Sequence, residues 1–382
     1  MRNSLLKIPV ILAATVTLIT TTAYLPASAL NSSEVDKFEQ YRQSIIQDEI
    51  VFAQKNLTSN RSSISSLDSR IEELENAEIV ELTFDNEGTL ITAESSEDGE
   101  VLDRFVKESS IELVDNQEDI EINNEASDLK YAVSPLSIIS NPTTPPAGSD
   151  SGAFHRIQTP TSSSLATSYT GVVADSITLP QYDITTALDT SNGKKTEAAY
   201  LYTGIDPGVA EVGFTTTRQN GLNMTAGWYP VFHAKATHTV QSGDNNGNGN
   251  TVEYYYDRAH RYDGGAVINN YKVYYKYDEA TLSVRFLIGS QIYQINFPGT
   301  TSTGKSVKRL TTIAMNGVSD KNQKFRVPFK TYAVWNNMRF LYNNGTQTKY
   351  PNEISGLVTN TWNHGGTLDY VKSGNTESIR IY

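Results

Sequence analysis

The sequence predicts a mainly β protein, in which an antiparallel β-sandwich follows a small acidic segment of mixed helix and strand. From Ala153 onward, short runs rich in Tyr, Val, Ile, Thr and Phe alternate with Gly, Asn, Asp and Pro, and helical periodicity is lacking. Charge divides the chain as well. Residues 30–130 hold 26 Asp and Glu against 8 Lys and Arg, whereas residues 131–382 hold 17 against 21. This asymmetry predicts two separate units.

Residues 1–29 are predicted to be an export signal. Arg2 and Lys7 precede an uncharged run over 8–22, and Ala27-Ser28-Ala29 supplies small residues where signal peptidase cleaves. The run is shorter than the roughly 20 apolar residues that a membrane-spanning helix needs. The 382 residues include no cysteine, which excludes disulfides, zinc-thiolate sites and cysteine nucleophiles. We therefore expect a secreted, extracellular protein without a stable membrane anchor.

The acidic N-terminal segment, residues 30–133, is predicted to contain a helical hairpin and a β-hairpin. A first helix is predicted over 33–54, where Phe38, Tyr41, Ile45 and Phe52 recur near helical spacing. A second helix is predicted with an apolar stripe from Ile64 to Leu74. The pattern then predicts strands over 79–84 and 89–93, joined by a Gly-containing turn. The acidic stretch that follows indicates a solvated face or tether. The alternative is a pro-segment or docking arm that covers the basic domain electrostatically.

A linker and the sandwich domain follow. Residues 134–152 hold four prolines among Ser, Thr and Gly, which predicts a linker. The domain over 153–382 has about a dozen predicted strands and no crossover helices, so its strands must be antiparallel, in two packed sheets or a closed barrel. We choose the sandwich. The clearest strands are 171–179, 197–202, 209–216, 227–240, 251–258, 267–277, 281–288, 291–297, 306–314, 326–335, 338–342 and 378–382.

Two parts of this domain resemble known families. Tyr271–Phe286, two strands joined at Tyr277-Asp278-Glu279-Ala280, resembles the hairpin of concanavalin-type lectin and glucanase jelly rolls. The stretch from His155 to the C-terminus, with its Thr196–Thr203 and Gly227–His233 segments, is similar to the YrpD-like secreted proteins of Gram-positive bacteria. These resemblances imply export and a concanavalin-like jelly-roll fold, and they imply no particular substrate.

Successive side chains of a strand point to opposite sides of a sheet, so alternation predicts one sheet with an apolar face and a polar, tyrosine-rich face. The predicted apolar face consists of Trp228, Phe232, Ala234, Ala236, Val252, Tyr254, Tyr256, Val273, Tyr275, Leu282, Val284 and Phe286. Tyrosine rings give CH–π contact to sugars, and fixed charged groups hydrogen-bond to their hydroxyls. An ordinary solvated face is the alternative. The candidate ligand-binding residues are Tyr229, His233, Tyr255, Asp257, Tyr274 and Arg285.

Binding is favoured over cleavage. Hydrolysis of a glycosidic bond needs two carboxyl groups at a fixed separation, and the sequence pairs none of the acids on the predicted inner strands. A lyase would need a base such as His233 or Tyr255, with Arg285 or a lysine to neutralise a uronate carboxylate. We therefore expect a non-catalytic binder of an extracellular or cell-wall polysaccharide. The runner-up is a polysaccharide lyase or glycoside hydrolase on the same face, and a structural matrix or surface protein is the third possibility.

One segment has the composition of a calcium loop. Asp244, Asn246 and Asn248 match the opening of such a loop, but its twelfth position is Tyr255 in place of a bidentate Glu, so a mobile hairpin turn is the alternative. The histidine spacing predicts no transition-metal site, and we expect no other cofactor. The weak positive charge of the sandwich domain does not suggest nucleic acid.

Overall fold

The computed structural model describes residues 36–56, 61–85, 88–107, 151–162, 167–183, 196–206, 210–216, 225–234, 255–277, 281–298, 306–316, 325, 327–364 and 366–382. The predicted export signal, the linker up to residue 150 and the calcium-loop residues Asp244, Asn246 and Asn248 lie outside this part of the chain. Two compact units are distinguished, residues 1–40 and 41–382. Among the described residues, the helices are too short or too polar to cross a membrane.

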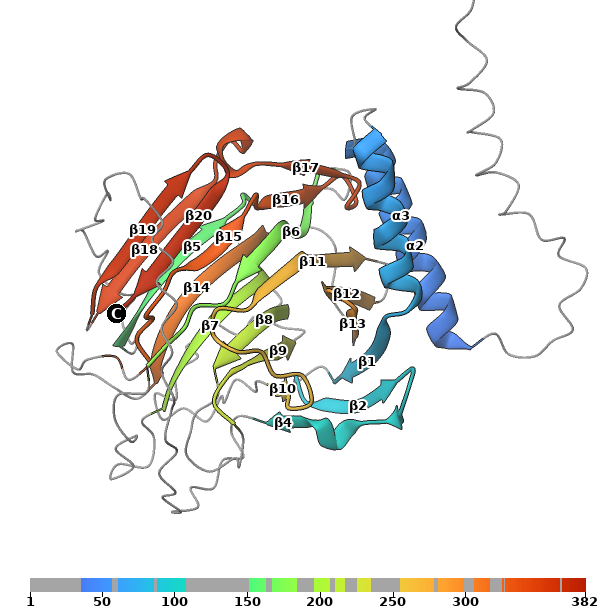
Figure 1. Ribbon diagram of the computed structural model, residues 1–382, viewed down its shortest axis with the longest axis horizontal. Helices are drawn as coiled ribbons and strands as arrows, with labels where there is room; N and C mark the ends of the chain where they lie inside the picture. Colours follow the sequence, from blue (N-terminus) through green and yellow to red (C-terminus); the bar gives the residue numbers. More distant parts are fainter. Residues whose placement is uncertain are drawn as a thin grey trace, which may run out of the picture. The chain divides into compact units, whose positions relative to one another are not determined.

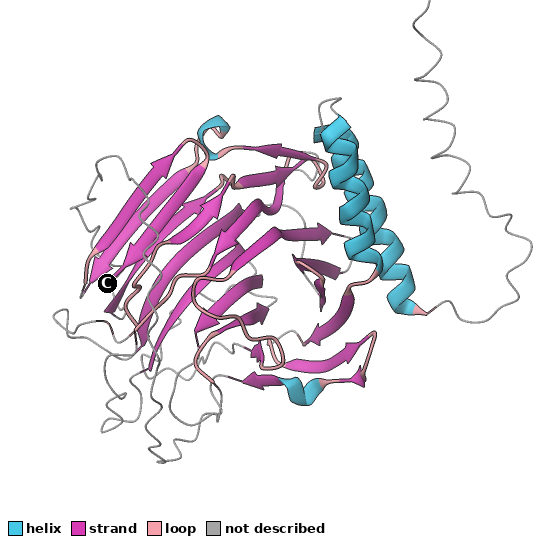
Figure 2. Cartoon of the chain, in the orientation of Figure 1, coloured by secondary structure: helices cyan, strands magenta, loops and turns pink. Residues whose placement is uncertain are grey.

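Two β-sheets form a sandwich, which confirms the predicted fold class (Figures 1 and 2). The twelve-stranded sheet has the order β19-β20-β15-β6-β11-β12-β13-β1-β2-β3, and β16 pairs with β6 and β17. Its strands are β1 (Glu78–Phe84), β2 (Leu90–Ser95), β3 (Gly99–Glu100), β6 (Tyr169–Thr178), β11 (Val267–Tyr277), β12 (Thr281–Ile288), β13 (Gln291–Pro298), β15 (Ala333–Asn336), β16 (Arg339–Tyr342), β17 (Gln347–Lys349), β19 (Leu368–Ser373) and β20 (Thr376–Ile381).

The eight-stranded sheet has the order β18-β5-β14-β7-β8-β9-β10-β4. Its strands are β4 (Phe105–Lys107), β5 (Ser151–Gln158), β7 (Thr196–Asp206), β8 (Ala210–Thr216), β9 (Trp228–Ala234), β10 (Tyr255–Asp257), β14 (Ser306–Asn316) and β18 (Val358–His364). Short 3-10 helices, η1 (Leu102–Arg104) and η4 (Pro351–Glu353), precede β4 and β18.

The acidic segment contributes strands to both sheets. The predicted hairpin is present as β1 and β2, and β1 also pairs with β13, the one parallel pair among the described strands. β4 pairs with β10 in the other sheet. An isolated two-stranded hairpin is marginally stable in water, and pairing with β13 buries Val80, Leu82 and Phe84 in the shared core. The charge boundary in the sequence is therefore not a boundary between folded bodies.

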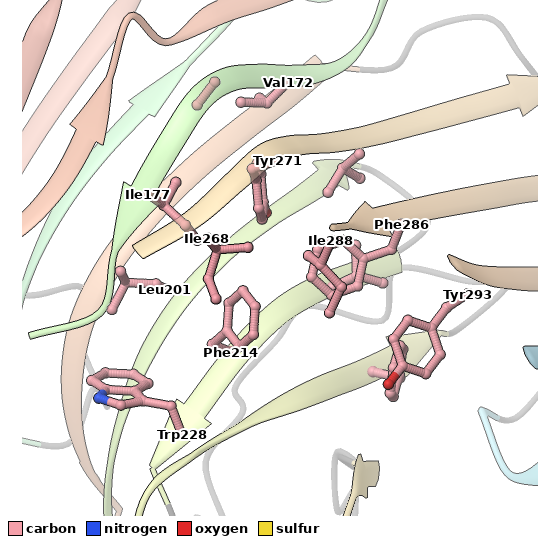
Figure 3. Packing of buried hydrophobic residues seen from close by; sticks show 14 of the residues in the cluster. Val172, Ile177, Leu201, Phe214, Trp228, Ile268, Tyr271, Phe286, Ile288 and Tyr293 are labelled. Atoms are coloured by element: carbon pink, nitrogen blue, oxygen red, sulfur yellow. The ribbon is translucent and has the colours of Figure 1, made fainter. Parts of the chain in front are cut away.

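Aromatic side chains fill the space between the sheets. Phe286 of β12 makes edge-to-face contacts with Phe214 of β8 and Tyr271 of β11, at centroid distances of 5.8 and 5.5 Å (Figure 3). Trp228 of β9 is fully buried, and its indole donates to the carbonyl of Pro180 at 2.9 Å. Alternation correctly assigned the core-facing side chains of β9, β11 and β12.

Two helices precede the strands, α2 (Lys37–Asn56) and α3 (Arg61–Glu75), close to the predicted positions. They are tied together because Arg42 Nη1 of α2 donates to the carbonyls of Leu74 and Ala77, at 2.8 and 2.9 Å. From Tyr41 onward α2 lies against the outer face of β11 and β12 (Figure 1). One predicted strand is shorter than expected: within 326–335, only Ala333 onward is a strand, and the carbonyl of Pro328 instead accepts from the amide of Asp183.

Candidate functional site

The six predicted ligand residues lie in three separate places. Tyr274 and Arg285 are on the outer face of the twelve-stranded sheet, and Tyr229 and His233 are on the outer face of the eight-stranded sheet. Tyr255 and Asp257 point between the sheets. The predictions placed β9 to β12 in one sheet, whereas β9 and β10 belong to a different sheet from β11 and β12. In addition, β10 has the opposite parity from that expected: Tyr255 is in the core and Tyr256 faces outward, against Tyr229.

A basic strip runs along the outer face of β11 and β12. We define it as Lys272, Lys276 and Arg285. Tyr274, between the two lysines on β11, is directly opposite Arg285 on β12, and Arg285 is in turn opposite Gln294 on β13. The Arg285 Nε donates to Gln294 Oε1 at 3.0 Å. The strand register therefore sets a phenol, a guanidinium and a carboxamide in one row across three strands.

Helix α2 covers this basic strip with carboxylates. Asp48 accepts a hydrogen bond from Arg285 Nη1 and forms an ion pair with Lys276 at 3.3 Å. Glu49 Oε1 lies 2.5 Å from Lys272 Nζ. Ser44 adds a hydroxyl, whose oxygen accepts from Arg285 Nη2 at 3.0 Å. Lys272 and Arg285 are consequently buried, although they lie on an outer sheet face.

Ser44, Asp48 and Glu49 were not among the residues predicted from the sequence. The predicted apolar stripe of this helix included Phe52, which packs on Val173, Tyr274 and Leu341. Asp48 is four residues before Phe52 and Ser44 four residues before Asp48, so all three share one helix face. A carboxylate within an otherwise apolar stripe was the available signal that this face meets a basic surface.

Tyr274 is enclosed by α2 and by the turn after β16. Its hydroxyl donates to the carbonyl of Asn344 at 2.8 Å. Gly345 in this turn has a φ of +74°, and a Cβ there would come within 2.5 Å of the Tyr274 ring. Burial, together with the negative charge of Asp48, raises the pKa of Tyr274 well above its usual value. The phenol of Tyr274 is therefore uncharged at neutral pH, and it lies between the two lysines of the strip.

Two glutamates continue the row beyond Gln294. Glu81 of β1 is the register partner of Gln294, and Glu94 of β2 is directly opposite Glu81. The carboxamide of Asn296 donates to Glu81 Oε1 at 2.6 Å, and the hydroxyl of Tyr41 donates to the same oxygen. Neither glutamate was a sequence candidate, because their place in this row beside Gln294 depends on β1 joining β13.

Asp257 belongs to an ionic cluster that connects the two sheets. We call Glu78, Arg104, Asp257, His260 and Tyr293 the inter-sheet clasp. Asp257 Oδ2 lies 2.8 Å from Arg104 Nη2, 2.9 Å from His260 Nδ1 and 2.9 Å from the Tyr293 hydroxyl, which donates to it. Arg104 Nη1 also reaches Glu78 Oε1 at 2.7 Å. Asp257 is fully buried and therefore faces protein groups on every side.

The charges of the clasp stabilise each other. Burial by itself would raise the pKa of Asp257, but hydrogen bonds from His260 and Arg104 outweigh burial and lower it. The same holds for Glu78. Burial raises its pKa, but hydrogen bonds from Arg104 and Ser95 have the larger effect, so the pKa is lowered overall. Burial likewise raises the pKa of Tyr293 well above its ordinary value. This phenol stays a hydrogen-bond donor at neutral pH.

The remaining two candidates lie on the outer face of the eight-stranded sheet. His233 Nδ1 is 3.7 Å from Glu211 Oε2, and Lys308 Nζ is 2.7 Å from Glu211 Oε1. Lys308 reaches Glu211 across Gly204, where a Cβ would come within 2.8 Å of the lysine chain. Burial would raise the pKa of Glu211, but Lys308 and His233 lower it far below the usual range. Tyr229 donates to the carbonyl of Thr225 at 2.8 Å.

The described residues offer little for a metal ion. Within this part of the chain, His, Asp and Glu side chains do not gather in groups of three or more that could hold one. The possible calcium ligands fall outside it, so that prediction stays open.

Comparison with known proteins assigns no family to the chain. Neither a family model nor a curated protein matches it. The geometry of the candidate surfaces is therefore the basis for assigning a function.

Proposed function

We propose that the protein is a secreted, non-catalytic binder of an extracellular or cell-wall polysaccharide, and that it binds through the outer face of β11, β12 and β13. One observation carries the proposal: Arg285 holds a carboxylate and a hydroxyl at the same time, from Asp48 and Ser44. Polysaccharides present hydroxyls, and many present carboxylates as well, so they offer the same two groups that Arg285 binds here.

The neighbours of Arg285 suit the same kind of ligand. Gln294 and Asn296 are carboxamides that both donate and accept hydrogen bonds, and they are linked to each other at 3.1 Å. Lys272 and Lys276 supply charge on either side of Tyr274. All of these side chains project from paired strands of one sheet. A rigid scaffold of this kind keeps polar groups at fixed separations, which is a requirement for recognising a repeating polymer.

A glycan array probed with the purified full chain tests the proposal. We expect retention on a subset of polysaccharides and a strong loss of retention in Arg285→Gln. The matched control is Arg339→Gln, which removes a guanidinium from β16 of the same sheet, where it pairs with Asp175. Retention that is equal in wild type and Arg285→Gln would contradict binding at this face. Near-UV circular dichroism of both variants ensures that folded proteins are compared.

Glycoside hydrolysis is the second candidate function, and the Glu81–Glu94 pair favours it. Directly opposed residues in an antiparallel pair have Cβ atoms about 4.5–5.5 Å apart. Retaining glycosidases place their two carboxyl groups about 5–5.5 Å apart, a separation that the flexible side chains of two directly opposed glutamates can reach. The pair continues the row that contains Arg285 and Gln294, so a bound chain could reach it.

The release of reducing ends distinguishes the two functions. Glutamate-dependent hydrolysis would release reducing ends from a retained polysaccharide, and Glu94→Gln would abolish the release without reducing retention. The non-catalytic proposal expects retention without release. A rise in absorbance from unsaturated uronates would instead indicate a lyase.

A further inference from the structure

Helix α2 presents to the basic strip the chemical groups of an acidic sugar. Asp48 gives a carboxylate to Arg285 and Lys276, Glu49 gives a second carboxylate to Lys272, and Ser44 gives a hydroxyl. A carboxylate and a hydroxyl within reach of one guanidinium are what a single uronate residue offers. Arginine favours carboxylates because its planar fork donates along two parallel directions.

The covered strip remains open to water at one margin. The side chain of Lys276 is 37% exposed and that of Asp48 is 29% exposed, whereas Lys272 and Arg285 are almost completely covered. An incoming anion can therefore meet Lys276 first and exchange with Asp48 in steps. Ion pairs at such a margin are weakened by salt and by competing anions.

We propose that the basic strip is a polyuronate-binding site and that helix α2 is its intramolecular competitor. This inference rests on the proposed function and specifies its ligand class. A carboxylated polysaccharide displaces Asp48 and Glu49 and takes over their contacts with Lys276, Arg285 and Lys272. Only molecules in which the helix has left the strip can bind the polysaccharide. The apparent affinity of the intact chain is therefore the intrinsic affinity of the strip multiplied by the fraction of such molecules.

The competition can be tested with polygalacturonate as the probe. Asp48→Asn with Glu49→Gln weakens the cover while leaving the strip intact, and we expect its dissociation constant to fall about tenfold or more relative to wild type. Adding Lys272→Gln and Arg285→Gln to this variant should abolish the gain. The matched control is Asp68→Asn with Glu72→Gln, which removes one Asp and one Glu from exposed positions of α3. It should bind as wild type does.

Two results would overturn the inference. One is a gain in the Asp48 and Glu49 variant no larger than in the Asp68 and Glu72 control, which would indicate general electrostatic attraction. The other is an equal gain for inorganic polyphosphate, which would make the strip a general anion site. The proposed function fails separately, if no glycan of any charge is retained on the array.

Hydrogen exchange gives a readout that does not depend on a double variant. Saturating polygalacturonate should increase exchange in residues 41–56 of the wild-type chain, because the helix leaves the strip, and should decrease exchange in β11 and β12. If the double variant does not fold, Glu49→Gln alone removes only the contact with Lys272 and should give a smaller gain in affinity. Bound polygalacturonate with unchanged exchange in residues 41–56 would refute displacement of the helix.

Discussion

Arg104 and Asp257 are 153 residues apart in the chain, and their side chains meet with Nη2 2.8 Å from Oδ2. Arg104 also contacts Glu78 of β1 at 2.7 Å, so a single guanidinium connects the eight-stranded sheet with the twelve-stranded one. Asp257 is fully buried, and the side chain of Arg104 is 13% exposed. The inter-sheet clasp therefore joins the acidic segment to the sandwich through buried ion pairs.

Arg104→Ala should destabilise the protein strongly. Removing one partner of a buried ion pair leaves the other charge uncompensated, which typically costs about 3–5 kcal/mol. Urea unfolding at pH 7 measures the loss. The control is Arg258→Ala, since Arg258 is 51% exposed and pairs with Asp103 at 3.9 Å, so its change should stay within about 0.5 kcal/mol. Equal losses in the two variants would show that the clasp does not stabilise the fold.

Acid should unfold the protein through the same carboxylates. The pKa values of Asp257 and Glu78 are lowered in the folded state, from ordinary values of about 3.9 and 4.3. A lowered folded-state pKa contributes stability above the unfolded value and loses it as the pH falls toward the folded value. The free energy of unfolding should therefore be steady above about pH 5 and fall below about pH 4.

Asp257→Asn should reduce this acid dependence. The variant is expected to be less stable than wild type at pH 7, because the asparagine makes weaker contacts with Arg104 and His260. The difference between the two proteins in the free energy of unfolding should become smaller below pH 4, where wild-type Asp257 becomes protonated as the protein unfolds. Urea midpoints between pH 3 and 7 provide the comparison. Parallel curves for the two proteins would exclude Asp257 as a source of the acid sensitivity.

The alternation of apolar and polar side chains along a strand allowed the core-facing side chains to be predicted from the sequence. In β9, β11 and β12 the apolar set of each strand faces the core, because only one parity buries Trp228, Tyr271 or Phe286. In β10 the rule failed. This strand has three residues, two of them tyrosines, and either ring can fill the core or cover a face, so Tyr255 was assigned to the wrong side.

The features that could not be predicted from the sequence depend on contacts between residues far apart in the chain. The assignment of β9 and β11 to different sheets depends on β6 pairing with β11, which no local pattern encodes. The contact between Asp48 and Arg285 joins residues 237 apart. Asp257 similarly needs Arg104, whose position follows from the pairing of β4 with β10. Local patterns thus predicted most strands and most faces but missed β5, β18 and β19, and the partners of charged side chains required the tertiary fold.

Phe286→Ala should test the aromatic core. Phe286 contacts the rings of Phe214, Tyr271 and Tyr293, at 5.8, 5.5 and 6.0 Å between centroids. Truncating a buried phenylalanine to alanine costs about 3–5 kcal/mol through lost burial and the cavity left behind. The control Val267→Ala changes a side chain that is 55% exposed, so it should cost under about 1 kcal/mol. A small loss in Phe286→Ala, measured by urea unfolding, would mean that the two sheets are not packed through this cluster.

Gly213→Ala should show that β7 and β8 approach each other too closely for a side chain at this position. A Cβ on Gly213 would lie 2.1 Å from the carbonyl oxygen of Leu201 and 2.5 Å from the Cα of Tyr202. Because both atoms belong to the backbone of β7, a strand must move, and overpacking of this kind costs about 1–3 kcal/mol or more. Gly374→Ala is the comparison, since nothing lies within 4 Å of its Cβ but its φ is +59°. There the cost is conformational, about 1 kcal/mol. If thermal unfolding shows Gly374→Ala to be the more damaging substitution, the tight packing of β7 on β8 is refuted.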